Sequence, residues 1–199
     1  MRKLEKFDRR TILAGLSATA LIGLDRQAFA QRSFQSETPQ TYSGNEVIAA
    51  GHRFFGGAAR GLANLVERAT QQWGHPSAYI LGQEGGGAFF AGLRYGEGML
   101  YTKGGADAKV FWQGPSLGFD FGGDGARTMM LGYRVRSPED LYRRFGGIDG
   151  SAYLVGGLGM TALAADNMMV VPIRTGVGAR LGVSGGYLKF TPSATWNPF

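Results

Sequence analysis

The sequence predicts a mainly β protein: a small antiparallel β-barrel of about eight strands, with one long N-terminal helix and a short helix packed on it. The first observation is an alternation in the stretch Gln83–Gly123, where large residues recur at every second position between glycines or small polar residues. A period of two is typical of strands that bury one face. The second is the number of glycines within the pattern, which indicates strong coiling or close approach of two backbones. The large residues are Phe89, Leu93, Tyr95, Met99 and Tyr101, followed by Leu117, Phe119 and Phe121.

Residues 1–30 are predicted to be a cleaved signal peptide. Basic residues, including Arg9 and Arg10, precede the apolar run Thr11–Leu24, and Ala28 and Ala30 form a small-x-small cleavage site. The apolar run is shorter than the roughly 20 residues of a spanning helix, which favours cleavage over a retained anchor. The paired arginines also resemble a twin-arginine export motif. The sequence therefore predicts an exported, periplasmic protein that is cleaved after Ala30.

The processed chain is expected to consist of a disordered arm and one domain. Residues 31–44 are polar and include a proline, which is typical of a disordered terminus. Residues 45–199 are then long enough for a single domain with its own core. Cysteine is absent from the sequence, so this core has to form without disulfides.

Asn45–Trp73 is the long helical segment, because apolar residues recur there at spacings of three, four and seven. Ser43 or Asn45 can cap its N-terminus. Glycines near Gly56 lower the helix propensity by about 1 kcal/mol each and predict a break there. One interpretation is a helix packed against a face or mouth of the barrel. The other is an amphipathic helix whose Arg53, Phe54, Phe55 and Arg60 face a lipid surface.

The rest of the chain is predicted to form short strands, one turn and one short helix. The turn is Lys103–Asp107. The helix is Ser137–Phe145, since Ser137 can cap it, Pro138 suits its first position and acidic residues follow. Pro172 indicates an edge or a bulge in its strand. The expected strands are Ala78–Gly82, a bent strand or hairpin within Gly86–Lys103, Ala108–Gln113, Ser116–Gly122, Arg127–Arg134, Ser151–Leu158, Met160–Ala165, Met168–Thr175 and Val177–Phe190.

The charge of the chain does not indicate a nucleic-acid partner. The sequence has 21 basic and 15 acidic residues, and six of the basic and three of the acidic residues lie in the first 30, so the remainder has a net charge of +3. No cluster of basic and aromatic residues remains after processing. An outer-membrane barrel is disfavoured as well, because the strands are short, glycine fills many positions and the last nine residues do not alternate.

The motifs that could support catalysis or cofactor binding lack their usual context. Gly157–Ala162 fits a dinucleotide fingerprint, but β-type sequence follows it where a helix is needed. The acidic turn Asp120–Gly125 lacks the late glutamate of a calcium loop. His52 and His75 are not in a metal-ligand spacing. Glu84 and Glu97 could converge as an acid–base pair, although nothing else selects them. No metal, cofactor or enzymatic activity is therefore predicted.

Two resemblances follow from the residues of the barrel. The run GGGAFFAGLRYGEGMLYTK, a Trp-Gln-Gly-Pro step and SLGFDFGGDGARTMMLGY resemble the periplasmic family of envelope integrity protein A, from about Asn45 to the terminal WNPF. This resemblance implies a role in maintaining the cell envelope. More remotely, GAFFAGLRYGEG and GPSLGFDFGG are similar to the SYLF lipid-binding domain, which implies contact with a lipid or another amphiphile.

The function expected from these features is non-enzymatic support of the envelope, with an anionic lipid or another envelope component as partner. Arg53, Phe54, Phe55 and Arg60 are the candidate binding residues, because an aromatic ring beside a guanidinium suits an amphiphile with an anionic head. Two adjacent helical residues diverge by about 100°, so one phenylalanine should face the core and the other should lie at the helix edge. The alternatives are a scaffold that binds another envelope protein and a hydrolase of envelope glycan.

Overall fold

The computed structural model describes residues 40–85, 93–115, 126–148, 151–175, 186–195 and 197, and these contain one antiparallel sheet of ten strands. The strands are β1 (Ala78–Gly85), β2 (Leu93–Thr102), β3 (Ala108–Pro115), β4 (Ala126–Tyr133), β5 (Arg144–Gly147), β6 (Tyr153–Val155), β7 (Leu158–Met160), β8 (Leu163–Ala165), β9 (Met168–Thr175) and β10 (Tyr187–Thr191). Pairing of β4 with β9 closes eight of them into a barrel in the order β4-β1-β2-β3-β10-β5-β8-β9. Strands β6 and β7 extend from β9 as a hairpin. The predicted fold class is confirmed.

The barrel is filled rather than hollow over the described residues. Its interior is a continuous apolar core in which Trp112, Phe145 and Phe190 are the largest fully buried side chains. The Phe190 ring lies 6.1 Å from the Trp112 ring and 5.7 Å from the Phe145 ring, so the three aromatics form a chain across the interior. This core links β3, β5 and β10, which are far apart in sequence.

The alternation that predicts the first strands has its glycines, not its large residues, on the inner face. Gly82 and Gly96 point into the barrel. A Cβ on Gly96 would overlap the Trp112 indole, and a Cβ on Gly82 would overlap the β2 backbone at Glu97 and Gly98 as well as the edge of the same ring. The large residues Tyr95 and Met99 therefore lie on the outer face of the sheet. Glycine is needed here because one tryptophan fills the space that two inward side chains would otherwise occupy.

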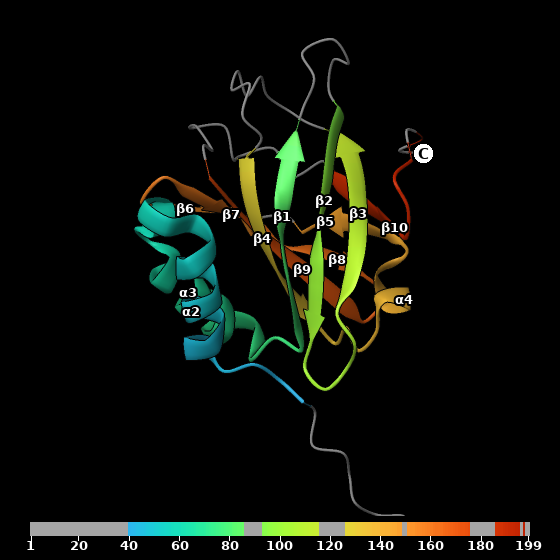
Figure 1. Cartoon of the computed structure of the whole chain (residues 1–199). Helices are drawn as coiled ribbons and strands as arrows, with labels where there is room; N and C mark the ends of the chain where they lie inside the picture. The colour runs from blue at the N-terminus through green and yellow to red at the C-terminus, as the bar shows by residue number, and fades with distance from the viewer. Residues whose placement is uncertain are drawn as a thin grey trace, which may run out of the picture. The chain divides into compact units, whose positions relative to one another are not determined.

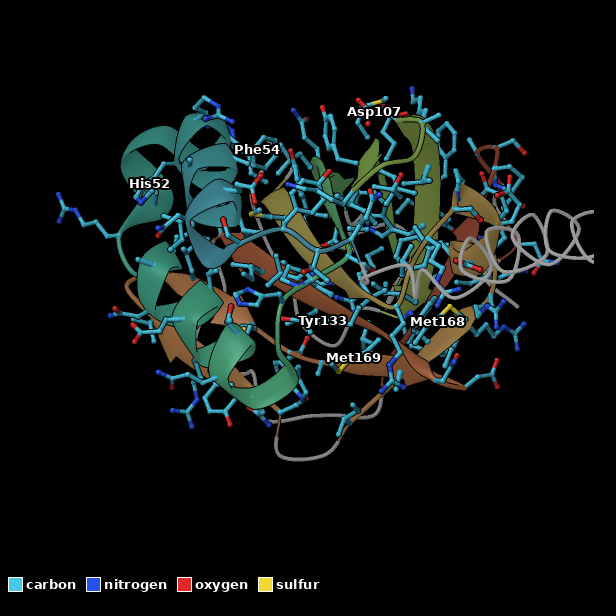
Figure 2. The ribbon with its side chains drawn as sticks, turned by 90° about the horizontal axis from the view of Figure 1, so that it is seen from below. His52, Phe54, Asp107, Tyr133, Met168 and Met169 are labelled. Carbon is cyan, nitrogen blue, oxygen red and sulfur yellow. The ribbon has the colours of Figure 1, made fainter. Side chains whose placement is uncertain are left out.

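A second core lies outside the barrel, between the sheet and two helices. Helix α2 (Gly44–Phe55), the 3₁₀ turn η1 (Gly56–Ala59) and helix α3 (Leu62–Trp73) form a helical hairpin. It packs on the outer face of β4, β7 and β9, and Figure 1 shows the two helices beside β4. On β9, Met168 belongs to the inner core and its neighbour Met169 packs against the outer one, and Figure 2 labels both. The helices therefore cover one side of the barrel, and Tyr79 and Leu81 of β1 pack against the edge of this core. The outer face of β2 and β3 is not part of it.

The predicted long helix is divided in two, and the break is at the predicted position. Gly56 and Gly61 both have positive φ, +59° and +97°, which only glycine adopts without strain. The helix starts with a capping box, in which Ser43 and Glu46 bond each other's backbone N–H groups. A salt bridge from Lys103 and these hydrogen bonds lower the pKa of Glu46 to about 2.

Several predicted boundaries are wrong. The short helix α4 (Pro138–Leu141) ends before Phe145, which lies in β5 and pairs with β10. Residues 151–158 form a hairpin rather than one strand, because Gly156 and Gly157, both with positive φ, turn the chain between β6 and β7. The prediction of an edge or a bulge at Pro172 is wrong: β9 pairs on both sides, and its register with β4 continues through Met130 and Pro172 without an extra residue. Pro172 instead lies where β9 changes partner from β8 to β7.

The folded part of the chain begins before Asn45. The N–H of Tyr42 donates to the carbonyl of Pro76, and the Tyr42 ring packs edge-on against Tyr79 at 4.9 Å. The predicted signal peptide and most of the predicted arm lie outside the described residues. So do Ser116–Gly122 and the predicted strand residues in 86–92 and 176–185.

Candidate functional site

The candidate site is a groove on the outer face of β1, β2 and β3. Figure 1 shows these strands on the other side of β4 from α2 and α3. Its cavity measures about 370 Å³, within the range of small-molecule sites, about 300–1,000 Å³. The described lining residues are Gln83, Glu84, Gly85, Tyr95, Gly96, Glu97, Phe111, Trp112, Gln113, Ala194 and Thr195. Three neighbouring strands and the segment after β10 therefore build the groove together.

The strand register places the lining side chains in two rows across the sheet. In the first row, Gln83 of β1 lies opposite Glu97 of β2, which lies opposite Phe111 of β3. In the second row, Gly85 lies opposite Tyr95, which lies opposite Gln113. Directly opposed residues have Cβ atoms about 5 Å apart, so each row forms a continuous strip of side chains.

The groove is open because its second row begins with a glycine. Among the residues that the structure describes, none lies within 4 Å of the position that a Cβ on Gly85 would occupy. The opposite wall is the segment after β10, where the Asn197 carbonyl accepts a hydrogen bond from the Gln113 amide at 3.4 Å. Gln113 is only 1% exposed although it points out of the barrel, because this segment covers it. The segment after β10 therefore forms the end of the groove on that side.

A buried network inside the barrel braces the sheet beneath the groove. The Glu84 carboxylate accepts hydrogen bonds from the Trp112 indole N–H at 2.8 Å and from the Arg174 guanidinium at 2.6 and 3.1 Å. Burial acts to raise the pKa of Glu84, but the charges of Arg174 and Arg94 and these hydrogen bonds hold it below its ordinary value. Glu84 therefore stays ionised and ties β1, β3 and β9 together across the interior.

The structure rules out Glu84 and Glu97 as an acid–base pair. They are separated by one step in the cross-strand register, and their side chains leave the sheet on opposite faces. Glu84 points inward to Arg174, whereas Glu97 points outward and forms a salt bridge of 3.1 Å with Lys109. Carboxylates that cleave a glycosidic bond must face one substrate from two sides, which this pair cannot do.

The predicted binding residues lie at the end of α2, away from the groove. Phe55 is 2% exposed and belongs to the outer core, whereas Phe54 is half-buried at the helix edge, as the 100° divergence predicts. Arg53 and Arg60 are exposed. Figure 2 shows Phe54 on the barrel side of the helices and His52 on the outer side. Arg53, Phe54 and Phe55 end α2, whereas Arg60 follows the 3₁₀ turn with its carbonyl beside Gly156 of the β6–β7 turn, and none of the four lines the groove.

Arg127 connects the helix end to the groove. Its guanidinium donates hydrogen bonds to the carbonyls of Phe54 at 3.0 Å and Phe55 at 3.4 Å, which are C-terminal carbonyls of α2. It also lies opposite Gln83 in the register of β4 and β1. The end of α2 and the groove are therefore neighbours on one surface, although they are separate features.

Other chemistry has no described support. Within the described ranges, no three His, Asp or Glu side chains lie together in a way that could hold a metal ion. The same ranges hold no helix with the length and hydropathy of a membrane span. Arg9, Arg10, Ala28 and Ala30 lie outside the described residues, so their role in export stays a prediction.

Sequence reasoning missed the groove for a physical reason. It assigned the large odd-numbered residues of 89–101 to a strand face without identifying which face is buried. The signal that could have decided this is Trp112, since a residue of that size inside a small barrel needs bare inward positions opposite it. Tyr95 and Phe111 then have to lie outside.

The comparisons with known proteins agree on the fold and the family. Residues 40–199 match the family described as envelope integrity protein A. A crystal structure of a β-barrel-like, uncharacterised protein from Brucella abortus is 56% identical, with a TM-score of 0.74 over 80% of this chain and 99% of that chain. No curated protein matches the sequence, and the similarity to the SYLF domain stays a prediction. Since the family match spans the described barrel and both long helices, the protein belongs to the envelope integrity protein A family.

Proposed function

We propose that the protein supports the cell envelope as a non-catalytic binding module, and that the groove over β1–β3 is where it holds an envelope component. The family name supports the envelope role. The observation that carries the proposal is the groove, where two strips of aromatic, amide and carboxylate side chains adjoin the open floor at Gly85. Convergent polar groups in a partly apolar hollow are typical of a binding site.

A binding role fits the rigidity of this part of the barrel. Trp112 fills the interior behind Gly96, and the Glu84–Arg174 pair holds the strands from within. A platform that is braced in this way keeps its side chains in place before a ligand arrives, which lowers the entropic cost of binding. The described lining offers no second outward carboxylate beside Glu97, so binding without cleavage is the simpler function.

The proposed place of action is the periplasm. Residues 1–30 have the basic, apolar and small-x-small regions of a signal peptide, and Arg9 and Arg10 suit twin-arginine export. A protein exported by that route folds before it crosses the membrane. The absence of cysteine suits such a protein, because its core does not depend on disulfides that form after export.

A second candidate function is contact with an anionic lipid or another amphiphile at the end of α2. Phe54 is half-buried there while Arg53 and Arg60 are exposed, so a ring and two guanidinium groups are available on one edge. The direct packing of α2 and α3 on the barrel argues against uptake of a whole acyl chain beneath them, since Leu62 and Leu65 are fully buried in that contact. Such contact would therefore be confined to the surface.

The proposed function is tested by filling the groove in the cell. Gly85→Leu adds a side chain where no described residue lies within 4 Å of the new Cβ, so the fold should be kept while the groove is occupied. Gly146→Leu is the matched control, because Gly146 is an exposed strand glycine that also has open space around it but lies on β5. We expect cells with Gly85→Leu to be as sensitive to detergent as cells that lack the protein, at an unchanged protein level. Cells with Gly146→Leu should resist detergent normally. If cells with Gly85→Leu resist detergent as well as wild-type cells do, the groove is not needed for the envelope role.

A further inference from the structure

We infer that the ligand of the groove is an uncharged glycan strand, a chain of pyranose rings that the protein holds against Tyr95 and Phe111. This inference rests on the proposed function and names the class of ligand. It is carried by three features of the described lining: the placement of its aromatic rings, the kind of its polar groups and its charge balance.

The aromatic rings provide a surface of the right kind for sugar rings. Tyr95 and Phe111 are half-buried, come from neighbouring strands and are diagonal to each other in the two rows. Diagonal neighbours in a sheet lie about 7–8 Å apart, so two rings can contact successive parts of one extended ligand. The face of an aromatic ring is electron-rich and attracts the C–H groups that cover one face of a pyranose.

The polar groups match hydroxyl groups, which both donate and accept hydrogen bonds. The Gln83 amide offers a donor and an acceptor, the Thr195 hydroxyl offers both, and the Glu97 carboxylate accepts. Gln83 and Glu97 lie opposite each other beside the aromatic rings. A sugar stacked on the rings would present its equatorial hydroxyls to such a rim.

The charge balance disfavours an anionic ligand in this groove. None of the described lining residues is Lys, Arg or His. The outward carboxylate is Glu97, and Lys109 pairs with it from outside the lining at 3.1 Å. The Lys109 ammonium also lies 5.1 Å from the centroid of the Phe111 ring, so the charges beside the groove are one matched pair. An anionic headgroup would have to compete with Glu97 for Lys109, whereas an uncharged ligand leaves this pair intact.

The strand form of the ligand follows from the shape of the site. The groove crosses three strands and lies against the segment with Ala194 and Thr195 on the side of β10. On the side of β1 the lining includes Gly85, and no described residue lies within 4 Å of a Cβ position on it. A ligand that follows the groove across three strands is extended, as a chain of sugars is.

The test uses purified, signal-processed protein and calorimetric titration with three probes. Chitohexaose represents an N-acetylated cell-wall strand, cellohexaose represents a plain hexose chain, and phosphatidylglycerol vesicles represent an anionic surface. The variants are Gly85→Leu, Tyr95→Ala and the control Gly146→Leu, each checked for folding by circular dichroism. We expect at least one hexaose to bind, with affinity reduced about tenfold or more in Gly85→Leu and Tyr95→Ala and unchanged in Gly146→Leu.

Salt provides an independent readout. Binding of an uncharged hexaose should change less than about twofold between roughly 0.05 and 0.5 M salt, because no ion pair is screened. Which hexaose binds more tightly identifies the source of the strand. If neither hexaose binds at about 1 mM, or if only the vesicles bind, the inference is overturned. The proposed function would still stand if Gly85→Leu removes protection in the cell, and both would fall if it does not.

Discussion

At the scale of single residues, the barrel depends on the match between Trp112 and the glycines opposite it. Trp112 is 1% exposed and occupies the space in front of Gly82 and Gly96. The alternation of glycine with large residues predicts a strand correctly, because period two is a property of the backbone. It does not tell which face is inside, since that depends on Trp112, which lies on another strand.

The first prediction concerns this match. Gly96→Ala places a Cβ against the buried indole, so the strand or the ring has to move, and we expect a loss of about 1–3 kcal/mol in the free energy of unfolding. Gly85→Ala is the matched control, as it lies on the adjacent strand with open space around it, and it should be neutral or slightly stabilising. Urea denaturation of both variants measures the difference. Equal stability of the two variants would show that Trp112 does not restrict Gly96.

The second prediction concerns the buried ion pair. Glu84→Gln leaves Arg174 without its carboxylate partner. Because breaking a buried ion pair is strongly destabilising, we expect the free energy of unfolding at neutral pH to fall by about 3–5 kcal/mol. The pKa of Glu84 is lowered from 4.5, so the stability from ionised Glu84 is complete above that value and is lost as pH falls through its folded pKa. Wild type should therefore lose stability below about pH 4.5, and this part of the loss should be absent in Glu84→Gln.

Glu97→Gln is the control for the second prediction. The salt bridge between Glu97 and Lys109 is exposed, with side chains 58% and 54% accessible. The substitution should therefore lower the free energy of unfolding by less than about 1 kcal/mol. Denaturation curves over a series of pH values measure both variants. The account of the network fails if Glu84→Gln has the stability and the acid profile of wild type.

At the scale of elements, what could be predicted depends on how local the determinants are. The N-terminal cap at Ser43, the break at Gly56 and strand β9 are set by neighbouring residues, and the sequence predicts all three. The end of α4 is predicted wrongly because Phe145 pairs with β10, which is distant in sequence. The hairpin β6–β7 is also predicted wrongly, although its turn at Gly156 and Gly157 is local and a Gly-Gly pair is a hairpin signal.

The third prediction tests the helix end as a lipid contact. Phe54→Ala together with Arg60→Gln changes one half-buried and one exposed residue, so folding should be nearly intact. If the second candidate function holds, retention of the protein on phosphatidylglycerol vesicles at low salt should fall several-fold. Phe55→Ala is no substitute, because it removes a core ring and should cost about 3–5 kcal/mol. No vesicle binding by wild type would end the lipid hypothesis.

The fourth prediction concerns the export segment. Arg9→Lys with Arg10→Lys keeps the basic charge but removes the paired arginines, so export by the twin-arginine route should be blocked and precursor should accumulate in the cytoplasm. Fractionation and immunoblotting measure the ratio of precursor to processed protein. Normal export of the double variant would reject this route, and the rest of the signal peptide would then suit the general secretory pathway.

At the scale of the whole molecule, the two cores divide the barrel surface into a covered side and an exposed side. The helices bury the outer face of β4, β7 and β9, and the inner core holds the barrel together without them. The outer face of β2 and β3 is outside both cores although it carries the half-buried Tyr95 and Phe111 and the exposed Met99. Apolar groups that remain on a rigid surface are typical of a contact site, which makes this face the centre of the functional account.

The most direct test of the account locates the ligand on the protein. An envelope extract is separated into a glycan fraction and a lipid fraction, and each is titrated into isotope-labelled, signal-processed protein while amide chemical shifts are recorded. The account predicts that the glycan fraction shifts the amides of Gly85, Tyr95, Gln113 and Thr195, and that Gly85→Leu removes these shifts. Shifts that cluster around Phe54 instead, or that arise only from the lipid fraction, would contradict it.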